Sequence, residues 1–334
     1  MTTRPPLALS LPVTGADTRA GIELAQRMVG RGFGAVWASE VNGPDAFTQL
    51  GALAVTTEAD LGVAVVPVQT RTPMVLGMTA VTLAELSGGR FTLGVGASSE
   101  VIVAGWAGQD FSRPLTDVRE TVEALRPMLS GERSTYEGER VTVGGYRPHA
   151  TPPARVPLVL GALNPRSLEM VGELAADGVC LNQMTAAHTK VMLERVCTGA
   201  DEAGVSLPED FAVVARLFCC VTDQPDAVRD MVRHTFAPYI ATSVYNRFYR
   251  WQGFEAEAEG VLAAGRDREA AAAAISDRLV DEVFCIGSAE QVADRVAEFV
   301  AAGVTVPVVQ PFALGVEQAE QMLTDLQAAW DRAA

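Results

Sequence analysis

The sequence is poor in lysine and histidine, and this scarcity excludes several kinds of chemistry. Of the 26 basic side chains only Lys190 is a lysine, and no glycine run precedes it, so the chain has no Walker-type phosphate loop. The three histidines, His149, His188 and His234, are too scattered for a His-Glu-x-x-His zinc motif. We therefore expect neither P-loop nucleotide chemistry nor a bound metal.

Paired cysteines and long apolar runs are also missing. The five cysteines form no Cys-x-x-Cys motif and several lie in apolar stretches, a pattern typical of free thiols in a reducing compartment. No apolar run reaches the ~18 residues that a membrane span requires. The first residues, Met-Thr-Thr-Arg-Pro-Pro, contain no signal-peptide core. We expect a soluble, cytoplasmic protein without a membrane partner.

Basic residues are outnumbered by acidic ones, 26 to 41, and the formal net charge is −15. Nucleic acids and anionic membrane surfaces select for basic patches. The charge balance therefore argues against both as partners and leaves small molecules as the expected ligands.

Short β-branched runs alternate with longer helical patterns along the whole chain. Because such alternation requires each crossover to return to the same edge, it predicts a parallel sheet. Eight units fit a closed (β/α)8 TIM barrel better than an open sheet, and we expect residues 1–334 to form one domain. The expected strands are Leu7–Leu11, Ala35–Ala38, Leu61–Val66, Phe91–Val95, Pro157–Leu160, Gly178–Leu181, Phe211–Val221 and Val304–Val309.

The chain is longer than the about 250 residues of an ordinary barrel. The surplus is assigned to two places. One is a helical insertion at residues 223–281, before the last strand, and the other is a short β-excursion at residues 131–150.

The active site of a parallel barrel lies at the carboxyl ends of its strands, and Glu40 follows the second expected strand. A carboxylate inside a barrel mouth is costly unless it is paired or used in chemistry. Two interpretations remain open: Glu40 is an acid–base catalyst, or it is a scaffold carboxylate paired with a nearby arginine.

Two other strand ends carry polar groups. After the fourth strand, Ser98 or Ser99 could donate hydrogen bonds to a planar ligand, although a plain tight turn explains the loop equally well. After the fifth, Pro165 opens a helix beside Arg166 and Ser167, which suits an anion site; an ordinary helix start with a solvated arginine is the alternative. Since no strong nucleophile appears at these ends, the pattern favours an enzyme that uses a cofactor.

The segments that carry these features resemble the bacterial luciferase-like monooxygenase superfamily, and within it the branch that uses the deazaflavin coenzyme F420. The resemblance extends from about residue 7 to residue 330. It rests on the order and spacing of these segments: Trp37–Phe47, Leu61–Pro73, Ser87–Gly96, Gly105–Gly108, Leu163–Arg166, Ala176–Gly178 with Asn182, and Phe284–Gln291.

The resemblance implies a set of contacts. A non-proline cis peptide bond between Ala64 and Val65 would back the deazaflavin ring, and Trp106 and Asn182 would line the substrate side. Contacts to the ring and its ribityl chain would come from Ser39, Pro67, Ala97 and Ser98, and contacts to the phosphate from Leu163, Asn164, Arg166 and Ser167.

The implied activity is that of an F420-dependent oxidoreductase which moves a hydride between the cofactor and a small organic substrate. Two alternatives remain open: an FMN-dependent monooxygenase, and a binding protein of the same fold without a cofactor. Relatives are commonly dimers, so the resemblance also implies a homodimer.

Overall fold

The computed structural model describes residues 4–333, and its centre is a closed barrel of eight parallel strands, as predicted. The last strand of the barrel pairs with the first, Val308 opposite Ala8, and the pairing of β9 with β10 completes the ring. The barrel strands are β1 (Ala8–Leu11), β2 (Ala35–Ala38), β3 (Asp60–Val63), β5 (Phe91–Gly96), β8 (Leu158–Gly161), β9 (Gly178–Asn182), β10 (Ala212–Val221) and β12 (Val306–Pro311).

Side chains of each barrel strand alternate between the barrel interior and the surrounding helices. On β1, Leu9 and Leu11 belong to the large core between strands and helices, whereas Ala8 belongs to a separate interior cluster with Trp37 and Val159. Both faces of the sheet are therefore covered. This explains why the strands are near-continuous apolar runs in the sequence.

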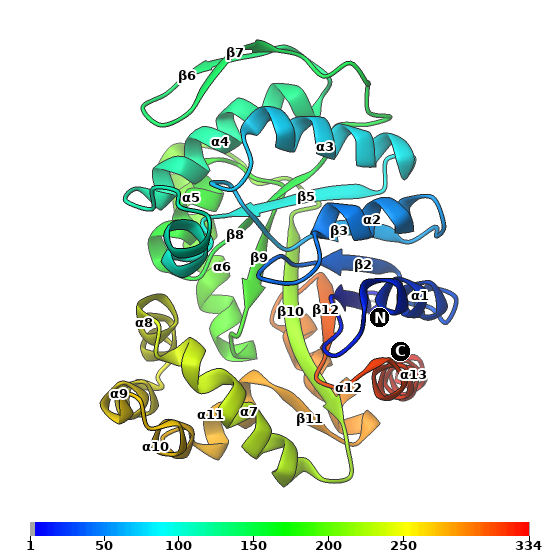
Figure 1. The fold of residues 1–334 in the computed structure, drawn as a ribbon, viewed down its shortest axis with the longest axis vertical. Coiled ribbons are helices and arrows are strands. Elements are labelled where there is room, and N and C mark those ends of the chain that lie inside the picture. Colours follow the sequence, from blue (N-terminus) through cyan, green and yellow to red (C-terminus); the bar gives the residue numbers. More distant parts are fainter. Residues whose placement is uncertain (1–3, 334) are drawn as a thin grey trace.

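Helices enclose the barrel on its outside (Figure 1). Most of them begin at a residue whose side chain accepts a backbone N–H group of the first turn. A capping box is present at α12, where Ser288 and Gln291 bond reciprocally. The barrel helices are α1 (Thr18–Val29), α2 (Ala46–Ala54), α3 (Pro73–Leu86), α4 (Pro114–Leu129), α5 (Pro165–Glu173), α6 (Ala186–Ala203), α12 (Ala289–Ala301) and α13 (Val316–Arg332).

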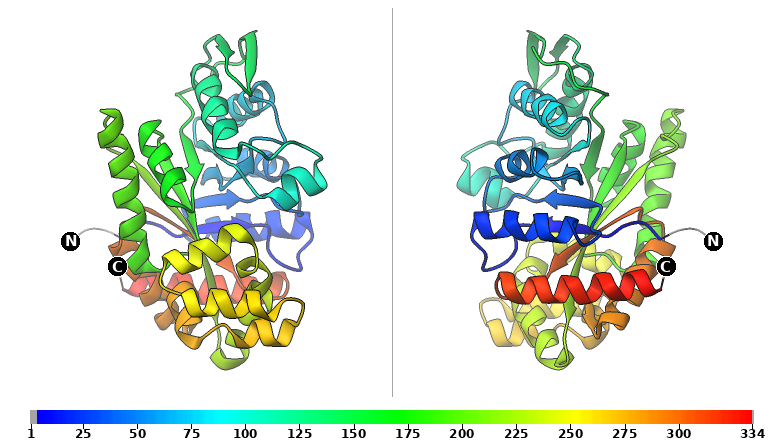
Figure 2. Two further views of the ribbon diagram at one scale, coloured as in Figure 1. Left: turned by 90° about the vertical axis from the view of Figure 1, so that its left-hand side faces the viewer. Right: turned by 90° about the vertical axis from the view of Figure 1, so that its right-hand side faces the viewer.

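The surplus residues lie at opposite ends of the molecule, as Figures 1 and 2 show. The predicted β-excursion is a hairpin of β6 (Ser134–Glu137) and β7 (Thr142–Tyr146). The predicted insertion is a group of helices with an aromatic core of its own. They are α7 (Pro225–Ile240), α8 (Ser243–Trp251), α9 (Glu255–Ala264), α10 (Arg268–Ala273) and α11 (Asp277–Val283).

Three short elements were not predicted. The strand β11 (Cys285–Gly287) pairs with the part of β10 that extends beyond the barrel. The two-residue strand β4 (Val66–Pro67) continues the path of β3, and a wide helical turn, η1 (Val101–Trp106), follows β5. Each is too short to give a periodic pattern of its own.

None of the helices in the described part of the chain is both long and apolar enough to cross a membrane. All five cysteines are free, as expected; four are buried, and Cys197 is exposed.

Helices α5 and α6 pack with their backbones in direct contact, and glycines make this possible. A Cβ atom added at Gly199 would lie 1.9 Å from the carbonyl oxygen of Glu169, and one at Gly172 would lie 2.0 Å from that of Val196. Because the obstructing atoms are backbone, they cannot turn aside as a flexible side chain would. The crossing fixes how closely α5 approaches α6, and the first turn of α5 carries the candidate phosphate-binding residues Arg166 and Ser167.

We expect Gly199→Ala to lower the free energy of unfolding by about 2 kcal/mol, because overpacking exceeds the gain in helix propensity. Gly51→Ala in α2 is the matched control, since its Cβ would meet only a leucine methyl at 3.9 Å; it should be neutral or stabilising by up to about 1 kcal/mol. Urea unfolding followed by circular dichroism measures both. Equal effects of the two substitutions would contradict this account of the helix crossing.

Candidate active site

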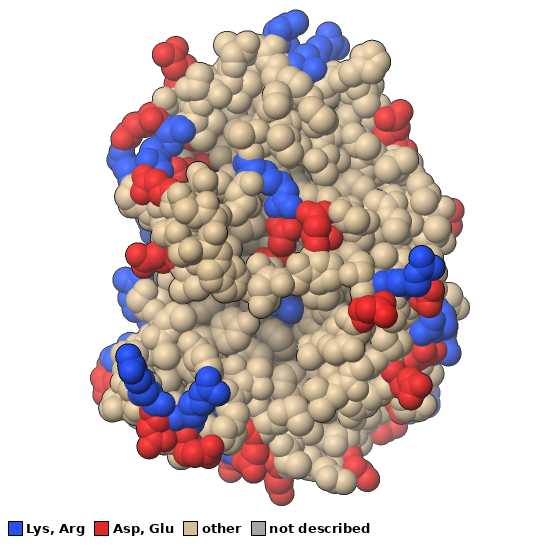
Figure 3. All heavy atoms as spheres, viewed as in Figure 1, with Lys and Arg blue, Asp and Glu red and all other residues tan. Residues whose placement is uncertain are grey.

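The residues assigned from the sequence lie at one end of the barrel. Ser39 follows β2, Pro67 ends β4, Ala97 and Ser98 follow β5, and Asn182 ends β9. These are the carboxyl ends of the strands, where parallel barrels hold their active sites. Figure 3 shows a hollow at the centre of one face, with acidic and basic groups side by side at its edge and a basic side chain at its floor.

The peptide bond between Ala64 and Val65 is cis and lies between β3 and β4, where the resemblance implied it. The Val65 side chain packs onto two glycines: a Cβ at Gly96 would lie 2.9 Å from Val65 Cγ2, and one at Gly161 would lie 3.1 Å from the same atom. Glycine at the ends of β5 and β8 therefore makes room for the bulge. Ala64 and Val65 both remain partly accessible.

The rim beside this bulge is built from small residues. Ser39 is buried and its hydroxyl donates to the Leu11 carbonyl at 3.4 Å. Ala97 and Ser98 are partly accessible, and Ser98 has φ of 60°, an uncommon conformation for a residue with a side chain. This rim leaves space for a flat ligand.

Trp37 forms the floor inside the barrel. Its six-membered ring lies against Gly62, where a Cβ would be 2.5 Å from Trp37 Cε3. The indole Nε1 is buried and has no hydrogen-bond partner in the described residues. Glycine at position 62 is therefore required by the tryptophan of the neighbouring strand.

Glu40 is bound to an arginine. Arg71 donates to both of its oxygens, at 2.5 and 2.9 Å, and also to Asp45 Oδ2 at 2.5 Å. The bonds to Glu40 raise the pKa of Arg71. Burial acts to raise the pKa of Asp45, but hydrogen bonds from Thr48 and the charge of Arg71 outweigh it, and the pKa is lowered. Glu40 is thus paired with an arginine, which is one of the two interpretations that its sequence position left open.

At the start of α5, the predicted polar residues bond mainly to one another. Asn164 Oδ1 accepts from the Ser167 N–H at 3.0 Å, and Ser167 Oγ accepts from the Asn164 N–H at 3.1 Å. The exposed Arg166 extends along the helix to Glu173, at 2.7 Å. Leu163 is partly buried beside them. A phosphate at this helix start could bind the Arg166 guanidinium only if Arg166 first left Glu173. The assignment of Leu163, Asn164, Arg166 and Ser167 to a phosphate therefore stays a prediction.

The opposite wall carries Asn182, whose Nδ2 donates to the Tyr245 hydroxyl at 3.4 Å, while its Oδ1 is buried without a partner in the described chain. Trp106, at the end of η1, is 58% exposed, so its place in the substrate pocket stays a prediction. Of the insertion aromatics, Phe248 and Tyr249 are buried core residues. The wall is therefore polar at β9 and aromatic where the insertion meets it.

The sequence reasoning missed one pair on this wall. Arg216 on β10 donates to Gln310 Oε1 on β12 from Nε at 3.2 Å and from Nη2 at 2.6 Å. The available signal was a single arginine inside the apolar run Phe211–Val221. No group of acidic, histidine or cysteine side chains in residues 4–333 is arranged to hold a metal ion.

A cavity of about 420 Å³ lies elsewhere, lined by Arg155, Leu158 and Asp177 among others. Arg155 and Asp177 precede β8 and β9, so this cavity is at the amino ends of the strands, where barrel residues serve stability. It is not the active site.

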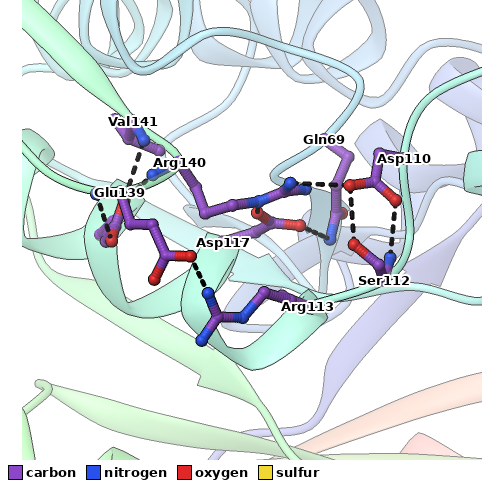
Figure 4. Close-up of polar contacts among 9 residues, drawn as sticks. Gln69, Asp110, Ser112, Arg113, Asp117, Glu139, Arg140 and Val141 are labelled. Atoms are coloured by element: carbon purple, nitrogen blue, oxygen red, sulfur yellow. Dashed lines mark hydrogen bonds and ion pairs between the residues drawn. The ribbon is translucent and has the colours of Figure 1, made fainter.

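A polar cluster fastens the loops that border the site (Figure 4). Arg140, in the hairpin turn, bonds from Nε to Asp117 Oδ1 at 2.8 Å and from Nη1 to Asp110 Oδ2 at 2.7 Å. Asp117 also accepts from Gln69 on the loop after β4, at 3.3 Å. Glu120 accepts three backbone N–H groups of residues 139–141 at 2.7–2.9 Å. The hairpin thereby joins the loop after β4 to the segment after η1.

We expect Arg140→Gln to speed amide hydrogen exchange about fivefold in residues 107–113 and in the hairpin turn, because it removes both bonds from one side chain. Exchange in the barrel strands should not change. Arg113→Gln is the control. It removes only the ion pair between Arg113 and Glu139, whose side chains are both exposed, and should have no measurable effect. Equal exchange in wild type and Arg140→Gln would show that the cluster does not restrain these loops.

Comparisons with known proteins agree with this geometry. The family model for luciferase-like monooxygenases matches residues 4–306. The chain is 31% identical to the "Putative coenzyme F420-dependent oxidoreductase" of Mycobacterium tuberculosis (strain ATCC 25618 / H37Rv), over 91% of this chain and 94% of that one. It is 27% identical to the 5,10-methylenetetrahydromethanopterin reductase of Methanolobus tindarius, over 82% of this chain and 85% of that one.

Among solved structures, the coenzyme F420 dependent tetrahydromethanopterin reductase of Methanopyrus kandleri superposes with a TM-score of 0.82 at 23% identity, and the match covers 99% of each chain. The match to the family model spans most of the sequence, and the barrel and the cis peptide bond between Ala64 and Val65 agree with what the resemblance implied. The chain belongs to the luciferase-like monooxygenase family.

Proposed function

We propose that this protein is an F420-dependent oxidoreductase that transfers a hydride between the deazaflavin C5 and a small organic substrate. The observation that carries the proposal is the rim at the cis peptide: Val65 packs on Gly96 and Gly161, and the small residues Ala64, Ala97 and Ser98 beside it are partly accessible. The relatives named for F420 support the choice of cofactor.

The residues present fit such a group. Ser39, Ala64, Ala97 and Ser98 would hold the ring, whose flat face needs small neighbours. Asn182 would lie on the substrate side, and its buried Oδ1 lacks a donor among the described residues. Asn164, Arg166 and Ser167 would hold the phosphate, with the Arg166 guanidinium released from Glu173. When bound, F420 supplies or accepts two electrons and a proton as hydride at C5.

The chain contributes orientation, exclusion of water and exchange of a proton. An electron-poor carbon of a conjugated C=C, a C=N or a carbonyl would receive the hydride, and the adjacent atom would receive a proton. We propose Glu40 as the residue that exchanges this proton. Glu40 would accept this proton in the oxidative direction and donate it in the reductive direction.

The assignment of residues 1–334 to one domain, the homodimer and the cytoplasmic location stay predictions from the sequence. They do not affect the chemistry proposed for this site.

The cofactor is tested by titration. We expect oxidised F420 to bind with a micromolar Kd and FMN to bind at least tenfold more weakly, measured by isothermal titration calorimetry. Ala97→Trp should abolish F420 binding because the indole fills the rim. Ala263→Trp, at an exposed position in α9, is the control and should bind as wild type does. Absence of F420 binding up to millimolar concentration, or tighter binding of FMN, would remove the proposal.

The role of Glu40 is tested by Glu40→Gln, which keeps the shape of the side chain and removes the exchangeable proton site. We expect kcat to fall by about 10²–10⁴, the usual contribution of a general acid or base, with the Kd for F420 unchanged. Stopped-flow oxidation of reduced F420 by substrates from an enone and imine screen measures it. A kcat within about threefold of wild type would leave Glu40 as a scaffold partner of Arg71.

A further inference from the structure

Arg216 lies deep in the mouth of the barrel. On β10 it is opposite Asn182 of β9 and Val308 of β12, so its side chain enters the barrel interior together with theirs. Val214, two residues earlier on β10, faces the same side of the strand and belongs to the interior cluster that includes Trp37 and Val159. Arg216 as a whole residue is partly accessible, so it lies where the barrel interior meets the hollow.

The guanidinium has a neutral partner only. Both of its bonds end on the same amide oxygen, Gln310 Oε1, and no carboxylate of the described chain forms an ion pair with it. Gln310 is itself held in place, because its Nε2 donates to the Pro12 carbonyl at 3.3 Å. Burial lowers the pKa of Arg216, opposed weakly by the hydroxyls of Tyr245 and Tyr239.

Burying the Arg216 guanidinium without a carboxylate partner costs free energy, although the chain has 41 acidic residues against 26 basic ones. A desolvated cation normally requires an anionic partner, and elsewhere in this chain Arg71 and Arg140 each bind two carboxylates. Only the face of Phe218, 5.0 Å from the Arg216 Cζ atom, adds a further favourable contact. The position next to Arg216 thus lacks a negative charge.

A second observation points to a ligand at the same place. Asn182, the register partner of Arg216, has a buried Oδ1 without a donor in the described residues. Two neighbouring side chains on adjacent strands are therefore incompletely satisfied, and both face the space in front of the rim. An anionic group of a ligand would satisfy the guanidinium, and a separate N–H or O–H donor on the ligand or on a bound water would satisfy the Asn182 oxygen, whereas an apolar ligand would satisfy neither.

We infer that Arg216 binds the substrate, and that the substrate is a small organic anion whose carboxylate or similar planar oxyanion lies against β10. The guanidinium fork matches a carboxylate in two parallel hydrogen bonds. With a net charge of −15 the protein repels anions at long range, so a local cation is the means of selecting one. The redox use of this site rests on the proposed function; the anion preference does not.

The test compares matched probes that differ only in charge: crotonate, benzoate and cinnamate, each against its primary amide. Binding is measured by isothermal titration calorimetry and by the rise in Tm, with and without oxidised F420. For wild type we expect at least one carboxylate to bind about tenfold or more tightly than its amide, the scale of a hydrogen bond to a charged group.

Two variants locate the effect. Arg216→Gln removes the charge and should abolish the discrimination. Gln310→Glu keeps the guanidinium but supplies a carboxylate beside it, so it should also abolish anion binding, and its folding is not at risk from an unpaired charge. Arg216→Lys should retain part of the preference. Lys190→Gln, an exposed position on α6, is the control and should leave the preference unchanged.

Three results would overturn the inference: no carboxylate of the panel binds better than its amide, the preference survives both Arg216→Gln and Gln310→Glu, or Arg216→Gln weakens F420 binding as much as probe binding. The last result would make Arg216 a cofactor contact. Failure of wild type to bind F420, with the carboxylate preference intact, would instead remove the proposed function and leave the anion site standing.

Discussion

The closure of the parallel sheet is the constraint on which the site depends. Because β12 pairs with β1 and β9 with β10, all eight strands end at the same rim. Residues as distant in sequence as Ser39, Ala97, Asn182 and Gln310 thus meet around one hollow. No local interaction brings them together; the ladder of interstrand hydrogen bonds does.

Glycines determine how this rim is shaped. Those at the ends of β5 and β8 receive Val65, and one on β3 receives the indole of Trp37. In each case a side chain from another part of the barrel wall occupies the volume that a Cβ would need. Any other residue at these positions would therefore displace Val65 or Trp37.

The eight barrel strands were predictable from sequence because their β-branched runs alternate regularly with helical patterns, whereas β4, β11 and η1 are too short to show a period of their own. The cis peptide position came from the resemblance, since no local pattern marks it. The partners of the charged groups were not predictable. Arg71 lies 31 residues from Glu40 and Gln310 lies 94 from Arg216, and only the folded barrel shows which pairs form. For the same reason the sequence could not show that Glu40 pairs with Arg71 or that Arg166 pairs with Glu173.

The seam between the two ends of the chain has a consequence for synthesis on the ribosome. The indole of Trp330 donates to the carbonyl of Pro5, and Gln310 reaches both Pro12 and Arg216. A growing polypeptide that lacks its final β/α unit has β1 and β10 as open edges, and its Arg216 stays hydrated. The part of the pocket wall formed by Arg216 and Gln310 is therefore completed only after the segment that carries β12 has emerged.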